Sequence, residues 1–103
     1  MLTVAERVEK GIQLLDEKSP GWRESIDLHQ LKMIQCDKCI LGQMFINYGR
    51  GRTELNLTQA ESVEHGFQSK DWGTPLLPSG SPAMVDYLEL EAEWHRRLTE
   101  NQP

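Results

Sequence analysis

The sequence predicts an all-α fold, a compact single domain of three to four helices with long irregular connections. Two capping boxes mark helix starts at Thr3-x-x-Glu6 and Thr58-x-x-Glu61, because each hydroxyl can accept from an early backbone N–H while the glutamate reaches back. Ser81-Pro82 marks a third start, since serine caps and proline at the first helical position loses no useful N–H. The alternating stretch 26–33 has no obvious second strand to pair with, so we expect no sheet.

The first helix is predicted to begin at Thr3 and to stop at Ser19-Pro20-Gly21, because proline removes a donor and glycine permits the turn. Trp22 follows directly and is expected to cover this helix, with an indole N–H that needs a partner if it is buried. Residues 26–33 are predicted to form an extended or 3₁₀ connection. The apolar residues expected in the core from this half are Val4, Val8, Ile12, Leu15, Ile26, Leu28 and Leu31.

A central helix is predicted over Cys39–Tyr48, starting near Asp37 as its cap, with Gly42 allowing another segment to pack closely. Its apolar face consists of Ile40, Leu41, Met44, Phe45 and Tyr48. The following stretch 49–52, Gly-Arg-Gly-Arg, is predicted to be a flexible basic loop.

The second capping box is expected to start a helix of about two turns, which Gly66 ends so that Phe67 folds back. Residues 68–80 are predicted to be a long loop rather than a domain linker, because too little chain follows for a second core. The last helix carries Val85, Leu88 and Ala92 on one stripe, with Tyr87, Leu90, Trp94 and Leu98 close by. Residues 1–103 therefore form one domain, with a flexible tail from about residue 99.

Charge and hydropathy restrict the partners and the compartment. Eleven basic and sixteen acidic side chains give a net charge of −5, which disfavours attraction to nucleic acid or to an anionic membrane surface. No apolar run approaches the roughly 20 residues that span a bilayer, and the N-terminus lacks the apolar centre of a secretion signal. We expect a cytoplasmic protein without a membrane partner, whose two cysteines are thiols.

Short motifs run through the middle of the chain: Gly21-Trp22, Ile26-Asp27, Leu31, Cys39-Ile40-Leu41-Gly42-Gln43 and Gly66-Phe67. This pattern resembles a group of small uncharacterised proteins of actinobacteria and their bacteriophages. Its most specific part is the Cys-aliphatic-Leu-Gly-Gln stretch at 39–43. The resemblance implies a source in a phage genome or prophage, in which case the cytoplasm is that of the host, and it implies no chemistry.

Cys36-x-x-Cys39 has the spacing of two zinc ligands, and His29 precedes the pair closely enough to fold back as a third. A tetrahedral site needs a fourth ligand, for which His65 and His95 are the remaining histidines. The sequence shows one cysteine pair where strong zinc motifs show two half-sites. We therefore expect no cofactor, with a zinc-dependent protein as the alternative.

The same cysteine pair at a helix start would also suit redox chemistry, because the helix dipole lowers a thiol pKa. Thioredoxin-like chemistry needs a βαβ setting, which this pattern lacks, so packing of one cysteine as a small apolar residue is preferred. No spacing fixes a nucleophile beside a base. We expect that the chain is not an enzyme.

Two charged stretches allow nucleic-acid hypotheses. Arg50 and Arg52 could grip phosphates, but two arginines in an acidic chain are more typical of a solvated connection. The acidic series Asp86, Glu89, Glu91 and Glu93 could imitate phosphates, yet it spreads around the helix, so a solvated face is preferred.

Trp72 and Trp94 are the candidate partner-binding residues, because exposed tryptophan commonly anchors protein interfaces. The function predicted from the sequence is that of a non-enzymatic protein-interaction module, in the form of a phage-encoded factor that binds or inhibits a host protein. The sequence does not identify the partner, and it does not decide between a monomer and a homodimer. The rival hypothesis is a small zinc- or thiol-dependent protein that uses Cys36 and Cys39.

Overall fold

The computed structural model describes residues 2–71 and 82–100 of the 103-residue chain. These residues form five α-helices and one 3₁₀ helix, without a strand. The elements are α1 (Val4–Lys18), η1 (Trp22–Ser25), α2 (Ile40–Phe45), α3 (Tyr48–Glu54), α4 (Gln59–Glu64) and α5 (Pro82–Glu100). The all-α prediction is confirmed for the described residues, which hold five α-helices where three or four were expected.

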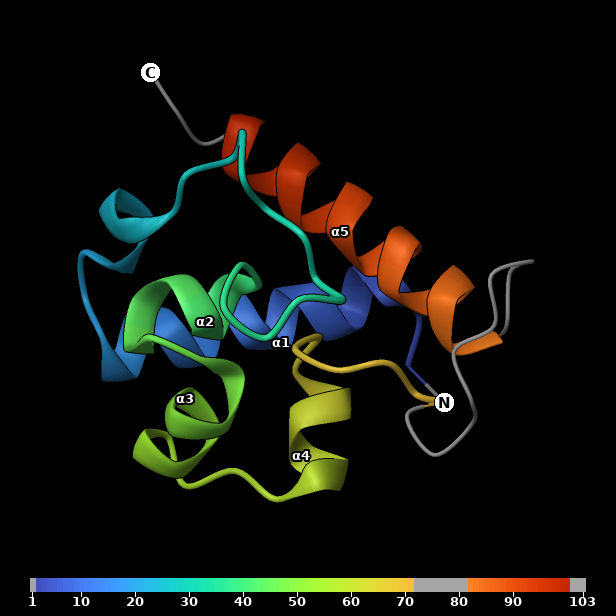
Figure 1. Ribbon diagram of the computed structural model, residues 1–103, viewed down its shortest axis with the longest axis horizontal. Helices are drawn as coiled ribbons and strands as arrows, with labels where there is room; N and C mark the ends of the chain where they lie inside the picture. Colours follow the sequence, from blue (N-terminus) through green and yellow to red (C-terminus); the bar gives the residue numbers. More distant parts are fainter. Residues whose placement is uncertain (1, 72–81, 101–103) are drawn as a thin grey trace.

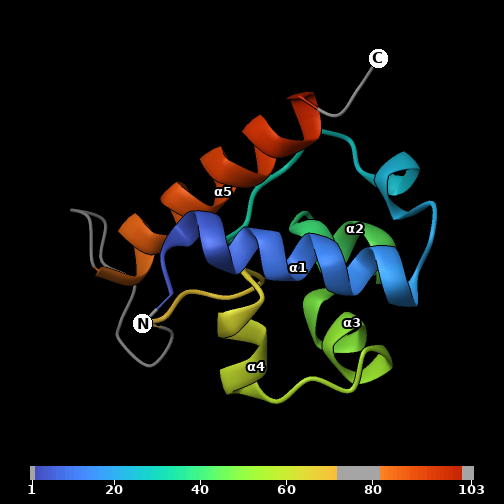
Figure 2. The same ribbon diagram turned by 180° about the vertical axis from the view of Figure 1, so that it is seen from behind.

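The two long helices, α1 and α5, pack against each other and carry the shorter elements (Figure 1). Seen from behind, α1 runs across the middle of the molecule, with α5 above it and α4 and α3 below it (Figure 2). Helix α4 contacts α1, and α2 packs against α3. The core therefore lies where α1, α5, α2 and the connections between them meet.

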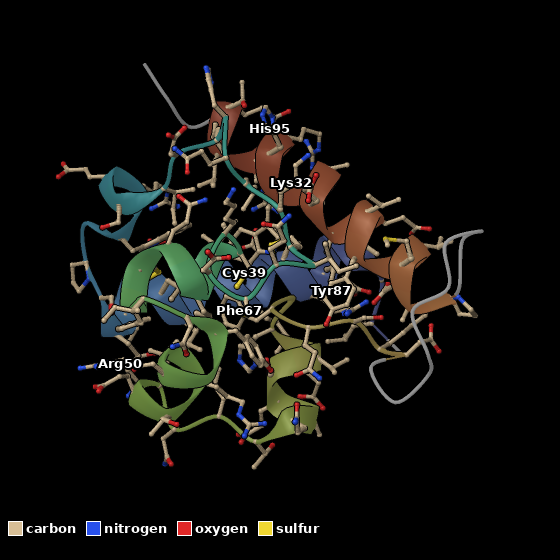
Figure 3. All side chains as sticks on the ribbon, in the orientation of Figure 1. Lys32, Cys39, Arg50, Phe67, Tyr87 and His95 are labelled. Atoms are coloured by element: carbon tan, nitrogen blue, oxygen red, sulfur yellow. The ribbon has the colours of Figure 1, made fainter. Side chains whose placement is uncertain are left out.

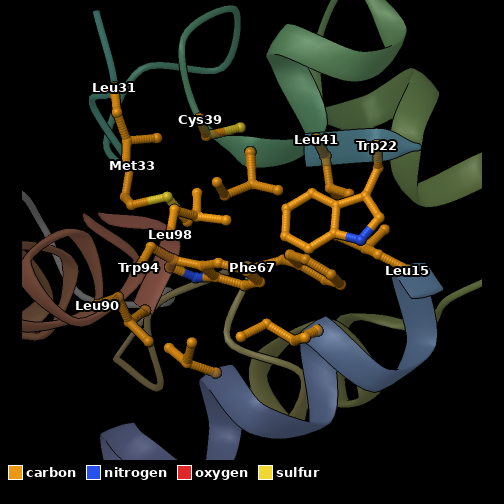
Figure 4. Close-up of a cluster of buried hydrophobic side chains, with 13 residues drawn as sticks. Leu15, Trp22, Leu31, Met33, Cys39, Leu41, Phe67, Leu90, Trp94 and Leu98 are labelled. Atoms are coloured by element: carbon orange, nitrogen blue, oxygen red, sulfur yellow. The ribbon is translucent and has the colours of Figure 1, made fainter. Parts of the chain in front are cut away.

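Aromatic rings occupy the centre of this core (Figure 4). Trp22 meets Trp94 edge to face at 6.0 Å between ring centroids, and Phe67 stacks on Trp94 at 5.7 Å. Trp22 donates its indole N–H to Asp16 Oδ1 at 2.9 Å, and Trp94 donates to the carbonyl of Gly66 at 2.8 Å. The predictions that Trp22 covers the first helix and that its N–H finds a partner are confirmed.

Both capping boxes form as predicted, with Thr3 and Thr58 as the N-caps of α1 and α4. Gly66 has φ +74° and donates its N–H to the carbonyl of Val63, which confirms the predicted turn after α4. Gly11 permits α1 to approach this turn, because an added Cβ would lie 2.2 Å from the carbonyl oxygen of His65. The connection between η1 and α2 is irregular, as expected, and buries Leu31 and Met33.

The predicted central helix Cys39–Tyr48 is wrong in its extent. Helix α2 is capped by Cys39 rather than Asp37, and it ends at Phe45 because Ile46 adopts φ +82° and leaves the helical region. The chain then turns, and the side chain of Asn47 caps α3 by accepting from the N–H of Arg50 at 2.8 Å.

The predicted flexible loop at 49–52 is also wrong, because these residues belong to α3. Gly51 packs so closely on α2 that an added Cβ would lie 2.8 Å from Leu41 Cβ. Packing against α2 thus outweighs the low helix propensity of two glycines. The predicted close packing at Gly42 is confirmed, since a Cβ there would lie 2.2 Å from the carbonyl oxygen of Cys36.

A buried ion pair between Arg7 and Asp86 joins α1 to α5. Two guanidinium nitrogens donate to the two carboxylate oxygens, each at 3.0 Å. The same guanidinium donates to the carbonyls of Val63 and Gln68 at 2.8 Å, and Asp86 accepts the N–H of Lys70 at 2.8 Å. The predicted solvated face for the acidic series is therefore wrong at Asp86, which is buried because Arg7 neutralises it.

Helix α5 runs to Glu100, so the predicted tail from residue 99 starts inside a helix, and 101–103 lie outside the described residues. Most of the predicted loop 68–80, including Trp72, also lies outside them. Within the described ranges, no helix is long and apolar enough to cross a bilayer.

Candidate functional site

The two cysteines occupy different environments at the start of α2. Cys39 is buried and its Sγ accepts the N–H of Gly42 at 3.2 Å. Burial raises the pKa of the Cys39 thiol to about 11, although backbone hydrogen bonds from Gly42 and Leu41 work in the opposite direction. Cys39 is therefore a neutral thiol near pH 7, unlike the activated thiolate that redox chemistry requires.

Cys36 is exposed, and its backbone carbonyl accepts the N–H of Tyr48 at 2.7 Å. This hydrogen bond ties the Cys-x-x-Cys segment to the first residue of α3. The Cys39 Sγ lies 3.8 Å from the same carbonyl oxygen. The segment between the cysteines therefore helps to hold α3 in place beside α2.

The predicted metal ligands His29, Cys36 and Cys39 do not come together as a set. In residues 2–71 and 82–100, no group of three or more histidine, cysteine or acidic side chains is placed to hold a metal ion. His29 is exposed, in a turn where its N–H is held by Asp27 Oδ1 at 2.9 Å. The zinc hypothesis stays a prediction for which the described residues supply the cysteine pair and no third ligand.

Trp94 is completely buried, which corrects its prediction as a partner-binding residue. Its ring stacks on Phe67 and its N–H donates to the carbonyl of Gly66, so it stabilises the core. The other candidate, Trp72, lies outside the described residues. The sequence signal that indicates a core position for Trp94 is its four-residue spacing from Leu90 and Leu98.

A small pocket of about 100 Å³ opens beside the cysteine pair. Its lining residues are Met33, Ile34, Cys36, Cys39, Tyr48, Phe67, Gln68 and Tyr87. They come from the connection before α2, from α3, from the segment after α4 and from α5. Figure 3 shows three of these residues, Cys39, Phe67 and Tyr87, near the middle of the molecule. We call this space the Cys36–Gln68 pocket.

Hydrogen bonds within the pocket wall are specific. Tyr48 Oη lies 2.8 Å from Ser62 Oγ and donates to Gln68 Oε1. Burial raises the pKa of Tyr48 and of Tyr87, so both phenols are neutral at physiological pH. Sequence analysis did not find this cluster, because its members lie far apart in the chain and form no motif.

The outer side of α5 carries an exposed apolar stripe, Val85, Leu88 and Ala92. Val85 and Leu88 are 45% and 56% exposed, because α5 turns its other side to the core. The buried residues of α5 are Ala83, Asp86, Leu90, Trp94 and Leu98. The stripe was visible in the sequence. The four-residue spacing of Asp86, Leu90, Trp94 and Leu98 indicates the opposite, buried face once Asp86 is counted with the three apolar residues.

The charged stretches considered for nucleic acid have local roles or face solvent. Glu91 accepts the N–H of Met33 at 2.9 Å, so it holds the connection before α2 against α5. Arg50 lies exposed in the first half of α3, as Figure 3 shows, and Arg52 is half-buried in the same helix. No ion pair is recorded for either arginine in the described part of the chain, and their separation on a helix gives no phosphate cradle.

The motif residues that carry the phage-protein resemblance have structural roles. Asp27 donates its N–H to Gln43 Oε1 at 2.6 Å, while Gln43 Nε2 donates to the carbonyl of Lys38 at 3.0 Å. Gly21 has φ +86° and precedes the buried Trp22, which explains that dipeptide. Comparison with family models, curated proteins and solved structures found no significant match to the chain.

Proposed function

We propose that this chain is a non-enzymatic protein-interaction module that docks a helix of a partner protein on the outer side of α5. The observation that supports it is the stripe Val85, Leu88 and Ala92, which stays in solvent on a helix that is fixed by its opposite face. Asp86 and Trp94 hold that face through an ion pair and a hydrogen bond. A rigid helix with an apolar outer stripe suits helix-on-helix recognition.

Charge along α5 specifies the docked helix further. Glu89 flanks the stripe in the N-terminal half of α5, and Arg96 flanks it in the C-terminal half; both are exposed. The complementary partner is an amphipathic helix that places a basic residue opposite Glu89 and an acidic residue opposite Arg96. Arg96 now contacts Glu93 and Glu100 within α5, and such exposed pairs contribute so little that they can exchange.

Because of the resemblance to phage proteins, we propose that the partner is a host protein, which the chain binds or inhibits. The titratable groups among the described residues that line the Cys36–Gln68 pocket are the two thiols and the phenols of Tyr48 and Tyr87, and burial raises the pKa of Cys39 and of both tyrosines. A second copy of the chain is the other candidate to cover the α5 stripe, and the test distinguishes it from a partner protein.

The test compares Leu88→Glu with Ala5→Glu, which adds the same charge at an exposed position of α1. Proteins captured from a host extract by the wild-type chain are identified, and light scattering measures self-association of the same samples. The proposal expects a partner that binds the wild type and the Ala5 variant and is lost with the Leu88 variant. Equal binding by all three chains overturns it, and a dimer that Leu88→Glu dissociates assigns the stripe to self-association instead.

A further inference from the structure

Cys36 and Cys39 lie on one tight turn that leads into α2. The carbonyl of Gln35 accepts the N–H of Lys38 at 3.1 Å and that of Cys39 at 2.9 Å, so the chain between the cysteines makes a single helical turn. Both cysteines line the Cys36–Gln68 pocket, and Cys39 Sγ lies 3.8 Å from the carbonyl oxygen of Cys36. The two thiols are therefore neighbours in space.

The two thiols differ in their access to solvent. Cys36 is exposed, whereas Cys39 is only 2% exposed. Burial raises the pKa of the Cys39 thiol to about 11, and the neighbouring Cys36 adds to the rise. Because an oxidant must reach a thiol and the thiolate is the form that attacks, the reaction has to start at Cys36. Cys39 is then the thiol beside the oxidised sulfur.

We propose that Cys36 and Cys39 are a modification site, at which a small disulfide such as oxidised glutathione produces a reversible disulfide within the chain. The Cys36 thiolate attacks one sulfur of the oxidant, whose S–S bond breaks and releases one thiolate. Cys39 then loses its proton to water and attacks the Cys36 sulfur, so the mixed S–S bond breaks and the second small thiolate leaves. The two protein thiols lose two electrons and two protons, which the oxidant takes up as two thiols.

The turn has to tighten when this bond closes. Cβ atoms three residues apart in a helical turn are about 5–6 Å apart, whereas a disulfide holds them at about 3.5–4.5 Å. The Cys36 carbonyl resists the movement, because it accepts the N–H of Tyr48 at 2.7 Å and packs where a Cβ on Gly42 would lie 2.2 Å away. A bond closed against such contacts is easily reduced again, which is typical of regulatory disulfides.

The oxidation state of the pair reaches α3 through the Cys36 carbonyl, since this carbonyl accepts the N–H of Tyr48. It also reaches α2, because Cys39 Sγ caps this helix by accepting the N–H of Gly42 at 3.2 Å. Oxidation should therefore alter the joint between α2 and α3. This joint is separate from the α5 stripe, and the inference does not depend on the proposed function.

The experiment exposes the reduced chain, near neutral pH, to mixtures of oxidised and reduced glutathione, and mass spectrometry weighs the intact chain after an acid quench. A disulfide within the chain removes two hydrogens, whereas a glutathione adduct adds the mass of the tripeptide. Cys39→Ser removes the second thiol and keeps an acceptor at the N-cap of α2, while Cys36→Ser leaves the buried thiol alone. Circular dichroism shows whether both variants are folded.

We expect the wild type to lose two hydrogens after a transient adduct, and dithiothreitol to restore its mass. Cys39→Ser should stop at a stable glutathione adduct. Cys36→Ser should react at least about tenfold more slowly than Cys39→Ser, because its thiol is buried and protonated. In NMR spectra of the wild type, oxidation should shift the backbone amide signal of Tyr48 and leave that of Lys10 in α1 unchanged.

A wild-type chain that keeps its glutathione adduct, as Cys39→Ser does, would overturn the inference, and so would chains joined to one another through Cys36. Equal rates for Cys36→Ser and Cys39→Ser would contradict the order of the two steps. An unmoved Tyr48 signal in the oxidised chain would contradict the link to α3. If the variants are unfolded, the masses and the Tyr48 signal of the wild type decide.

Discussion

Arg7 and Asp86 lie 79 positions apart in the sequence and meet as a buried pair with two hydrogen bonds of 3.0 Å. The pair links α1 to α5 and holds the side of α5 that faces the core. The orientation of α5, and with it the exposure of the stripe Val85, Leu88 and Ala92, therefore depends on this contact. Removing one charge leaves the other buried without a counter-charge, whereas removing both does not.

Substitution of Asp86 by alanine should destabilise the fold by about 3–5 kcal/mol, because it leaves the Arg7 guanidinium uncompensated in the core. The double variant Arg7→Met with Asp86→Ala should lose clearly less than the sum of the losses in the single variants Arg7→Met and Asp86→Ala. Urea unfolding of the wild type and the three variants gives the coupling free energy. Additive losses would contradict a coupled ion pair.

Stability should fall in acid through Asp86. Burial raises the pKa of this carboxyl, but the hydrogen bonds from Arg7 and from the N–H of Lys70 prevail and hold it below the ordinary value of 3.8. A lowered pKa in the folded state contributes stability above the unfolded pKa, and this contribution disappears as the pH falls through the folded pKa. The difference in unfolding free energy between wild type and Asp86→Asn should therefore shrink below about pH 4. A difference that stays constant down to about pH 2 would count against this account.

Two glycine-to-alanine substitutions should have opposite effects. In Gly11→Ala the new Cβ meets the carbonyl of His65 at 2.2 Å, so α1 must move away from the turn after α4, with a loss of about 1–3 kcal/mol. In Gly49→Ala the nearest atom lies at 3.5 Å, so the better helix propensity of alanine should raise stability by about 0.5–1 kcal/mol. Thermal unfolding measures both, and a stabilised Gly11→Ala would disprove the close approach.

At position 46, glycine should give a more stable protein than valine, although replacing isoleucine by glycine usually destabilises a protein more than replacing it by valine. Ile46 is 70% exposed and has φ +82°, a conformation that β-branched residues rarely adopt. Ile46→Gly relieves the strain and loses little burial, so it should unfold at or above the wild-type temperature, whereas Ile46→Val should change little. Calorimetry of both variants checks this order. A glycine variant that is clearly less stable would show that the turn between α2 and α3 is unstrained.

Local features of the fold were predictable from the sequence, and contacts between distant segments were not. Both capping boxes, the stop after α1 and the turn at Gly66 depend on neighbouring residues, so the pattern indicates them directly. The break between α2 and α3 depends on Ile46 adopting a conformation that its residue type disfavours. No residue propensity predicts that conformation, and α2 and α3, which it joins, pack so closely that a Cβ added to Gly51 would lie 2.8 Å from Leu41 Cβ.

The candidate sites were predictable only in part. The sequence identified Cys36 and Cys39, which do share a pocket, but Gln68 and Tyr87 reach that pocket from separate segments and carry no motif. Trp94 was expected as a partner anchor, whereas Gly66 and Phe67 hold it in the core. The Arg7–Asp86 pair helps to hold the buried side of α5, and it joins residues 79 positions apart, so no local pattern shows that contact.

The most direct test of the proposed interaction module places a photo-crosslinking amino acid at position 88, on the exposed stripe, and at position 5 as the control. After irradiation in a host extract, the account predicts one dominant crosslinked partner from position 88, mapped to an amphipathic helix, and none of it from position 5. Crosslinks that are the same from both positions, or none from position 88, would contradict the claim that the outer side of α5 binds a partner.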